Sequence, residues 1–351
     1  MIGHLAYASG SPCPTLVLDA SWLPTAPEQI RASLARVRRF LAGAGGGHVL
    51  KMALVRPSGH PMFDLDYRFV QALPHAVDAF DLRGSCGHSI LAATVAAARM
   101  GMLCRLTAGG RTRVRVLNNG DTVVCEVDRI DRDHVTFTIH FVRPAPMPAR
   151  QLLLTGEPRT TLTVGPDRDE VSLVSAGNAY VFVDARSLGV RDHHELFAAD
   201  GAFFARLSRI RAAAAERLGW SPEGVFPKIA ALVPTVAGEI AARAISVPSW
   251  HPTIALTGAV CLASATRIPD SVPWRMWQEM GRPDGPIGIA TPGGRTAVTA
   301  AVLSLAGEPA LSWVSVDGKQ VTSHGSFPLE PPPHLHLEEI TACLATSATS
   351  A

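Results

Sequence analysis

The chain has 351 residues, of which 47% are hydrophobic and 18% charged, with a formal net charge of +2. This length supports a large core and predicts two domains, while the near-neutral charge excludes a strongly basic nucleic-acid-binding protein. Because no apolar run approaches the ~20 residues of a membrane span and the N-terminus lacks a basic segment followed by an apolar one, we expect neither a membrane protein nor a secreted one.

The first predicted elements alternate between strand and helix. The segment TLVLDA, Thr15 to Ala20, is an apolar run that ends in a turn, which is typical of a strand. From Pro27 to Leu41, apolar side chains recur at helical spacing, and a proline suits the first turn of a helix. The glycine-rich loop that follows, residues 42–47, matches neither a phosphate-binding loop nor a dinucleotide-binding fingerprint.

The first residue with chemical potential is Lys51, within the predicted strand HVLKMALV. A lysine in an apolar strand is most often an edge or surface residue. The alternative is that Lys51 projects into a cleft, where desolvation would lower its pKa towards that of a useful base.

The second is Cys86, in the segment Gly84-Ser85-Cys86-Gly87. Small and apolar residues from Ile90 to Ala98 predict a tightly buried helix directly after it. Backbone N–H groups at the start of a helix are unpaired, attract anions and lower the pKa of a thiol. Cys86 is therefore either a reactive group or a small buried hydrophobe, and the flanking glycines, which let a ligand approach the backbone, favour the first.

The rest of the chain contains mostly short strands. The proline-rich segment Arg143 to Arg150 predicts a surface connection. The other expected elements are strands at 111–117, 122–128, 135–141 and 226–233, an amphipathic helix at 202–218, a strand or short helix at 239–245, strands at 296–305 and 311–316, and a short amphipathic tail after residue 330.

Two landmarks recur in the same order and suggest an internal duplication. Residues 8–20, ASGSPCPTLVLDA, are similar to residues 175–185, SAGNAYVFVDA, in their glycine, apolar strand and final Asp-Ala. Thr257-Gly258, at the start of a second small-residue helix, then falls on Cys86-Gly87. We interpret this as two related domains, 1–170 and 171–351, with chance similarity between apolar strands as the alternative.

The lysine in a strand, the segment DLDYRF and the Gly-x-Cys-Gly helix start together resemble the PrpF family. That family includes aconitate isomerases, methylitaconate isomerases and oxalomesaconate tautomerases, and it shares the diaminopimelate epimerase fold. The resemblance implies an α+β fold of two pseudo-symmetric domains, each a sheet wrapped around a central helix, with the active site in the cleft between them. Other similar segments are LLLTGEP at 152–158, VSAGNAYVFVDARSLG at 174–189, FPKIAALVP at 226–234 and LTGAVCLASATRIPDSV at 256–272.

The resemblance also implies a chemistry and a site. Lys51 and Cys86 match the positions implicated in proton transfer, and the implied reaction is a 1,3-proton shift on a small unsaturated acid without a metal or organic cofactor. Amides at the helix start would stabilise the enolate-like intermediate. The expected substrate-binding residues are Ser11, Gly87, His88, Ser89, Asn178, His251, Thr257 and Gly258.

The chain departs from the family pattern at three places. SGSPCPT, residues 9–15, stands where the family usually has GGTSKG, and Gly-His-Val-Leu precedes Lys51 where the family has Ser or Thr. Because buried carboxylates need paired donors, these changes predict a less anionic, larger substrate and weak binding of tricarboxylates. His88 replaces a common asparagine and would either fill part of the pocket or act as a second acid or base.

Three functions are open at this point. The first is a cofactor-independent isomerase or tautomerase, with a cyclase as a close variant. The second is a two-base epimerase, which would need a second cysteine where this chain has Thr257, because Cys261 lies about one helical turn further on and would point into the core. The third is a non-catalytic small-molecule-binding protein.

The cysteines and the composition bear on the setting and the partners. The six cysteines are widely spaced and form no CxxC pair, which argues against a zinc site and a disulfide framework and favours a reduced, cytoplasmic protein. The expected partner is a small-molecule substrate, with neither nucleic acid nor membrane, and a homodimer is left open.

Overall fold

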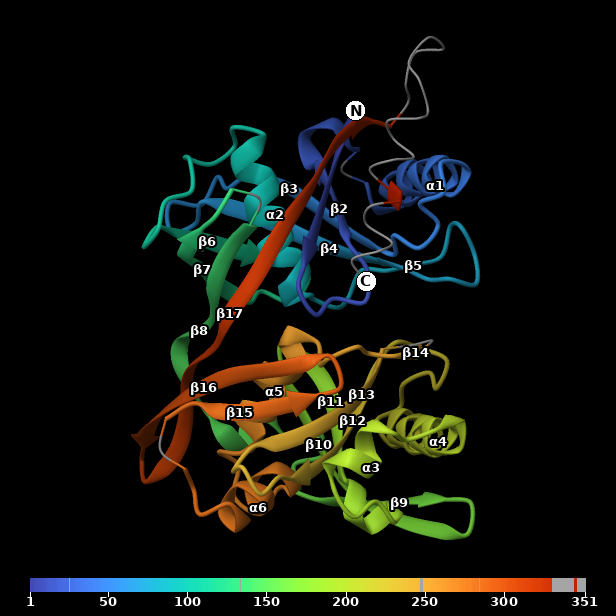
Figure 1. The fold of residues 1–351 in the computed structure, drawn as a ribbon, viewed down its shortest axis with the longest axis vertical. Helices are drawn as coiled ribbons and strands as arrows, with labels where there is room; N and C mark the ends of the chain where they lie inside the picture. The colour runs from blue at the N-terminus through green and yellow to red at the C-terminus, as the bar shows by residue number, and fades with distance from the viewer. Residues whose placement is uncertain (25, 133, 247–248, 284, 330–343, 346–351) are drawn as a thin grey trace. The chain divides into compact units, whose positions relative to one another are not determined.

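The computed structural model describes residues 1–24, 26–132, 134–246, 249–283, 285–329 and 344–345, and the chain forms two compact α+β units (Figure 1). Unit 1 comprises Met1–His140 and Gly318–Ala351, and unit 2 comprises Phe141–Asp317. The domain boundary expected at residues 170 and 171 instead falls inside a strand of unit 2. The first unit ends earlier than expected and is completed by the C-terminal segment.

Unit 1 is a mixed sheet wrapped around one helix. Antiparallel pairs β1/β2, β3/β4 and β6/β7 are joined by the parallel pairs β2/β3 and β4/β6. Because β17 pairs with both β1 and β8, the sheet closes on itself as a barrel. The strands are β1 (Ile2–Ala8), β2 (Thr15–Asp19), β3 (Lys51–Pro57), β4 (Leu65–Ala72), β5 (Phe80–Asp81), β6 (Arg111–Val116) and β7 (Thr122–Ile130), with the first part of β8 (His134–Pro148) and the last part of β17 (Glu308–Pro328), the rest of which belongs to unit 2.

The helix inside this barrel is α2 (Gly87–Arg99), and it contacts β1, β2, β3 and β4. Its residues are buried from Gly87 to Ala97, as expected for a run of small and apolar side chains. A second helix, α1 (Pro27–Gly43), covers the outside of the sheet and buries Ile30, Leu34, Val37 and Leu41. These four positions are those at which the sequence pattern predicted an apolar face.

In unit 2, antiparallel and parallel strand pairs follow one another along the chain in the same order as in unit 1. The antiparallel pairs β10/β11, β12/β13 and β15/β16 are joined by the parallel pairs β11/β12 and β13/β15. Strand β16 also pairs with β17 in antiparallel fashion. All residues of α5 (Leu256–Ala265) are buried. The other elements are β9 (Thr160–Val164), β10 (Asp167–Ala176), β11 (Asn178–Asp184), β12 (Lys228–Pro234), β13 (Ile240–Ser246), β14 (Ser249–Trp250), β15 (Ile287–Thr291), β16 (Gly294–Leu305), α3 (His193–Phe197), α4 (Gly201–Arg217) and α6 (Val272–Glu279), with short 3-10 helices at Ala20–Trp22, Ala149–Leu152 and Ala185–Leu188.

Most predicted elements are confirmed, with differences at the proline-rich segment and at residues 239–245. The expected surface connection at Arg143 to Arg150 is wrong, because β8 continues to Pro148. Residues left open between strand and helix at 239–245 form strand β13. The tail expected after residue 330 lies outside the described residues, apart from 344–345. Among the residues that the structure describes, no helix is both long and apolar enough to cross a membrane.

Candidate active site

Lys51 is the first residue of β3, where its backbone pairs with Thr15 of β2. Its side chain is buried, at 5% exposure, so the surface position considered from the sequence is excluded. The Lys51 Nζ atom donates a hydrogen bond to Ser11 Oγ at 2.8 Å, and Ser11 Oγ donates to the Cys13 carbonyl at 2.7 Å. The buried lysine is therefore held by the turn between β1 and β2.

Cys86 is the N-cap residue of α2 and has extended backbone angles. Its side chain is buried, and its carbonyl accepts hydrogen bonds from the Ile90 N–H at 2.9 Å and the Tyr67 hydroxyl at 3.3 Å. Tyr67 is buried as well, which raises the pKa of its hydroxyl well above the usual range. The helix start that carries Cys86 is thus fastened to β4 through Tyr67.

The electrostatics of Cys13 connect the lysine with the cysteine. Burial raises the pKa of the Cys13 thiol, Lys51 opposes that rise, and Cys86 adds to it. All three side chains therefore lie close enough to influence one another. The structure brings Ser11, Lys51 and Cys86 into one region of unit 1, as the sequence analysis predicted.

The first turn of α2 supplies the other predicted residues of unit 1. Gly87, His88 and Ser89 are all buried. The Ser89 hydroxyl lies 2.9 Å from Thr15 Oγ1 and also bonds to the Tyr67 hydroxyl, where it lowers the tyrosine pKa. Since these contacts engage Ser89, its observed role is to attach the helix start to β2 and β4.

In unit 2, a second group of predicted residues lies at the start of α5. Asn178, the first residue of β11, donates from Nδ2 to Thr257 Oγ1 at 2.9 Å. Gly258 is required by close packing, because a Cβ at this position would collide with the hydroxyl oxygen of Tyr180 and lie 2.6 Å from its Cζ. The structure therefore brings Asn178, Thr257 and Gly258 together.

His251 lies in the loop that leads to α5 and is buried. Its Nδ1 accepts a hydrogen bond from the Thr253 N–H at 3.1 Å, so in the neutral imidazole the proton is on Nε2. This arrangement presents His251 as a donor from Nε2.

Cys261 is not equivalent to Cys86. It is fully buried in α5, its thiol donates to the Val174 carbonyl at 3.3 Å, and burial raises its pKa to about 12. A thiol with this pKa is a poor source of thiolate near neutral pH. The expectation that Cys261 points into the core is confirmed.

Several residues at these sites were not selected from the sequence: Cys13, Thr15, Tyr67 and Tyr180. A signal existed for two of them, because Thr15 and Tyr180 each stand four residues before the aspartate of the repeated Asp-Ala. Both are in contact with the first turn of a buried helix, Thr15 with Ser89 and Tyr180 with Gly258. Cys13 and Tyr67 carried no comparable pattern.

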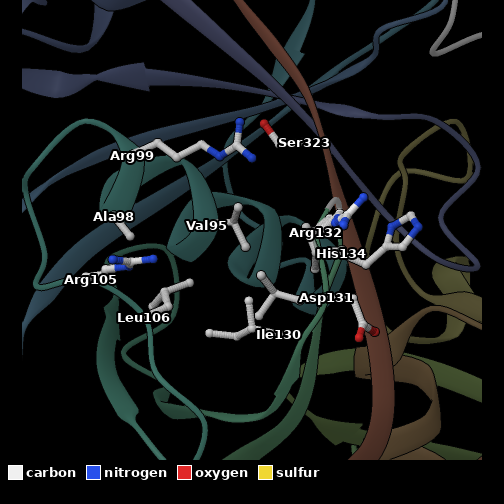
Figure 2. A pocket seen from close by; sticks show the side chains of 12 residues that line it. Val95, Ala98, Arg99, Arg105, Leu106, Ile130, Asp131, Arg132, His134 and Ser323 are labelled. Carbon is white, nitrogen blue, oxygen red and sulfur yellow. The ribbon is translucent and has the colours of Figure 1, made fainter.

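A separate pocket of about 310 Å³ lies beside the C-terminal half of α2 (Figure 2). Its lining includes Val95, Ala98 and Arg99 of the helix, together with Arg105 and His134, and none of the predicted site residues. Cys86 is more than two helical turns earlier in the chain. The pocket and the candidate site are therefore different places. We take the latter as the candidate active site because buried polar groups converge there.

The described residues contain no group of three or more His, Cys, Asp or Glu side chains that could hold a metal ion. In unit 1 the donors around Lys51 are an ammonium group, hydroxyls and backbone N–H groups, and in unit 2 the donors around Thr257 are a hydroxyl and an amide. Such donors suit the oxygen atoms of a small organic acid.

Comparisons with known proteins identify the family of this chain. Residues 36–304 match the family model of the PrpF protein. The chain is 27% identical to 4-oxalomesaconate tautomerase of Pseudomonas putida over 67% of this chain and 70% of that protein, and 24% identical to 3-methylitaconate isomerase of Eubacterium barkeri over 70% and 75%. The crystal structure of a methylitaconate-delta-isomerase superposes with a TM-score of 0.66 at 20% identity, covering 96% of this chain and 99% of that one. Since the family model spans most of the sequence, the chain belongs to the PrpF family.

Proposed function

We propose that the protein is a cofactor-independent isomerase or tautomerase that moves a double bond in an unsaturated or enolisable carboxylic acid. The observation that carries this proposal is the buried Lys51, held at 2.8 Å by Ser11, with Cys86 at a helix start in the same region, since both residues influence the pKa of Cys13. Membership in a family with tautomerase and isomerase relatives supports the reaction type.

The proposed reaction is a proton relocation. A base removes a proton from the carbon adjacent to the double bond, the electron pair delocalises onto the carboxyl group as a dienolate, and an acid delivers a proton to the far end of the allylic system. We assign Lys51 as the base and Cys86 as the acid in one direction, with the roles exchanged in the other. One proton is removed and one is added, so the balance requires no oxidant or reductant.

The amides at the start of α2 would stabilise the charge that develops on the substrate oxygens. These N–H groups lack intrahelical partners, and they point towards the end of the helix that carries Cys86. Donors fixed in place before reaction stabilise a developing oxyanion more than flexible ones do.

We further propose that the chain consists of two pseudo-equivalent halves. Support comes from the matching order of parallel and antiparallel strand pairs in the two units. Gly10 and Gly177 both have left-handed backbone angles, with φ of 85° and 89°, and Asp19 and Asp184 both cap a short 3-10 helix. In this scheme Thr257 is the counterpart of Cys86.

The unit 2 residues would bind the substrate rather than move its proton. A threonine hydroxyl is far too weak an acid for unaided proton transfer, but it can hydrogen-bond an oxygen. Because Thr257 Oγ1 accepts from Asn178, its own proton is available for a substrate oxygen. His251, buried in the loop that leads to α5, is a further candidate for substrate binding. A two-cysteine epimerase is disfavoured, since Cys261 is buried with a pKa of about 12.

The proposal is tested by solvent exchange. The protein is incubated in D₂O with itaconate, mesaconate, trans-aconitate and crotonate, and the carbon-bound protons are followed by NMR. We expect deuterium at the two ends of the allylic system of at least one acid. Binding of these acids without any exchange would replace the proposal with a non-catalytic binding protein on the same fold.

A further inference from the structure

Lysine is rare in this chain. Of its 32 lysine and arginine residues only three are lysines: Lys51, Lys228 and Lys319. Lysine is normally among the most exposed residues, yet Lys51 and Lys319 are buried, at 5% and 8% exposure, and Lys228 is half-buried. Arginine therefore supplies the surface cations, and the lysines stand where a compact ammonium group is needed in the interior.

Lys319 lies beside the turn that holds Lys51. On β17, Val321 pairs with Ala8 of β1, and the carbonyl of the neighbouring Gln320 accepts the Ser9 N–H at 2.8 Å. Lys319 therefore comes next to Gly10, one residue before the Ser11 whose hydroxyl binds Lys51. Two of the three lysines converge on one turn of unit 1.

The Lys319 side chain shares the inner face of β17 with Val321. Side chains alternate along a strand, so Lys319 and Val321 point to the same side. That side is the interior, because Val321 and its partner Ala8 are both buried. Thr322 occupies the other side, where its Oγ1 lies 2.8 Å from His134 Nδ1. Lys319 thus points towards the side where α2 packs.

Lys319 precedes the part of β17 that lies beside the C-terminal half of α2. Val321 and Ser323 line a pocket with Val95 and Ala98, in the C-terminal half of α2. Figure 2 shows Arg99 extending towards Ser323. Because Ser323 lies beside the end of α2, we infer that Lys319, four residues earlier on β17, lies closer to the start of the helix than Ser323 does.

We propose that Lys319 is a substrate-binding residue of the unit 1 site, where its ammonium group pairs with a carboxylate of the acid on which Lys51 and Cys86 act. This inference rests on the proposed function and deepens it. The turn Ser9–Thr15 has no cation of its own, and Lys319 supplies one from the neighbouring strand.

Burial has an energetic consequence that supports a functional role. It lowers the pKa of Lys319 to about 8, so the buried ammonium group costs free energy in the free protein. A carboxylate beside the ammonium group would reverse this shift. Arginine would not serve equally well, because its guanidinium is larger and stays charged.

Several titratable groups bear on the Lys319 side of unit 1. On the inner face, β1 and β17 have the apolar Ala8 and Val321 next to it, and the buried Cys86 and His88 stand at the start of α2. Lys51 and Cys13 follow on the adjoining strand and turn. On β8, His134 bonds to Thr322 and also lines the pocket that Val321 and Ser323 line, and His140 is near Glu126 of β7. Tyr7 pairs with Thr322, but its hydroxyl bonds to the Gly10 backbone and interacts electrostatically with Cys13, so Tyr7 belongs to the titratable groups beside this turn.

The rarity of lysine permits a direct test. Protein labelled with ¹³C at lysine Cε gives three signals, and Lys319→Met and Lys319→Arg assign the one from Lys319. We expect this signal to titrate near pH 8 in the free protein. Saturating mesaconate should move its midpoint upward, whereas the neutral crotonamide should not. No change in the Lys319 titration with mesaconate would overturn the proposal.

Calorimetry gives a second measure that does not depend on turnover. Lys319→Met should weaken mesaconate binding by about 10- to 100-fold, as expected for the loss of a charged hydrogen bond, and leave crotonamide binding unchanged. Gln320→Met, on the opposite face of the same strand, is the matched control and should bind like the wild type. Equal weakening of both ligands, or wild-type protein that binds no mesaconate, would contradict the role of Lys319. Absence of solvent exchange despite this binding pattern would count only against the proposed isomerase.

Discussion

At the scale of single residues, Gly258 illustrates how a position in the site is fixed by packing. The Tyr180 ring lies against its backbone so closely that no side chain fits. Gly258→Ala should therefore destabilise the protein by roughly 1–3 kcal/mol, the usual cost of overpacking a core. Urea unfolding monitored by circular dichroism measures the change.

Gly43→Ala is the matched control for this prediction. Gly43 is the exposed last residue of α1, and a Cβ there would meet nothing within 4 Å. The free energy of unfolding of Gly43→Ala should differ from that of the wild type by no more than about 0.5 kcal/mol. If Gly258→Ala were as stable as Gly43→Ala, the Tyr180 ring could not lie as close to the Gly258 backbone as described.

Lys319 leads to a prediction about stability and pH. Its pKa is about 8 in the folded protein, against a usual value of 10.5. Below pH 8 both states are protonated, and the folded state bears the full cost of the buried ammonium group. Between pH 8 and 10.5 the folded state releases its proton first, so the wild type gains stability relative to Lys319→Met by about 1.4 kcal/mol per pH unit.

The measurement is the free energy of unfolding of both proteins at pH 7 and pH 10. Lys319→Met should be the more stable protein at pH 7, and its advantage should shrink at pH 10. A difference between the two proteins that does not depend on pH would show that burial does not shift Lys319.

At the scale of elements, the start of α2 depends on contacts with distant strands. Ser89 meets Thr15 of β2, and the Cys86 carbonyl meets Tyr67 of β4. These contacts hold the cysteine next to the turn that carries Ser11. The helix start is therefore positioned by side chains rather than by its own cap, because Cys86 makes no side-chain capping bond.

A double-mutant cycle with Thr15→Val and Ser89→Ala tests this attachment. The two single variants and the double variant should reveal a coupling energy of about 0.5–1.5 kcal/mol in urea unfolding, typical of a buried hydrogen bond. Additive effects of the two substitutions would mean that the hydroxyls do not interact in solution.

The elements also show what the sequence predicts and what it does not. The apolar face of α1 and the buried run of α2 follow from periodicity and small-residue content, so both helices were predicted from the sequence. The extension of β8 to Pro148 was missed because prolines in 144–148 read as a connection. Prolines are tolerated where a strand needs no N–H donor, and that depends on its neighbours. The unit boundary was misplaced because β8 and β17 both contribute residues to both units.

In the candidate site, too, residues with an unusual local sequence were predicted and residues defined by distant contacts were not. Lys51 and Cys86 were predicted because their local surroundings are unusual: a lysine in an apolar strand and a cysteine between glycines. Cys13, Tyr67 and Lys319 were not predicted as site residues, because their relation to the site arises from strand pairings and from contacts between residues far apart in the chain.

At the scale of the whole molecule, the same pairing order of strands encloses a buried helix in each unit, but the residues at the two helix starts differ. Unit 1 supplies Lys51 and Cys86, which can carry protons, and unit 2 supplies Asn178 and Thr257, which can only donate and accept hydrogen bonds at neutral pH. Under the proposed mechanism, this asymmetry predicts proton transfer by groups of unit 1 alone and not a symmetric two-base reaction.

The most direct test of this division of roles is the rate of deuterium uptake from solvent in three variants, using the acid identified by exchange with the wild type. Lys51→Ala and Cys86→Ser should each slow exchange at saturating substrate by ~10²–10⁴-fold, the usual contribution of a general acid or base. Thr257→Ala should mainly raise KM and leave the saturated rate within a few-fold of the wild type. Loss of exchange in Thr257→Ala together with intact exchange in Cys86→Ser would contradict the assignment.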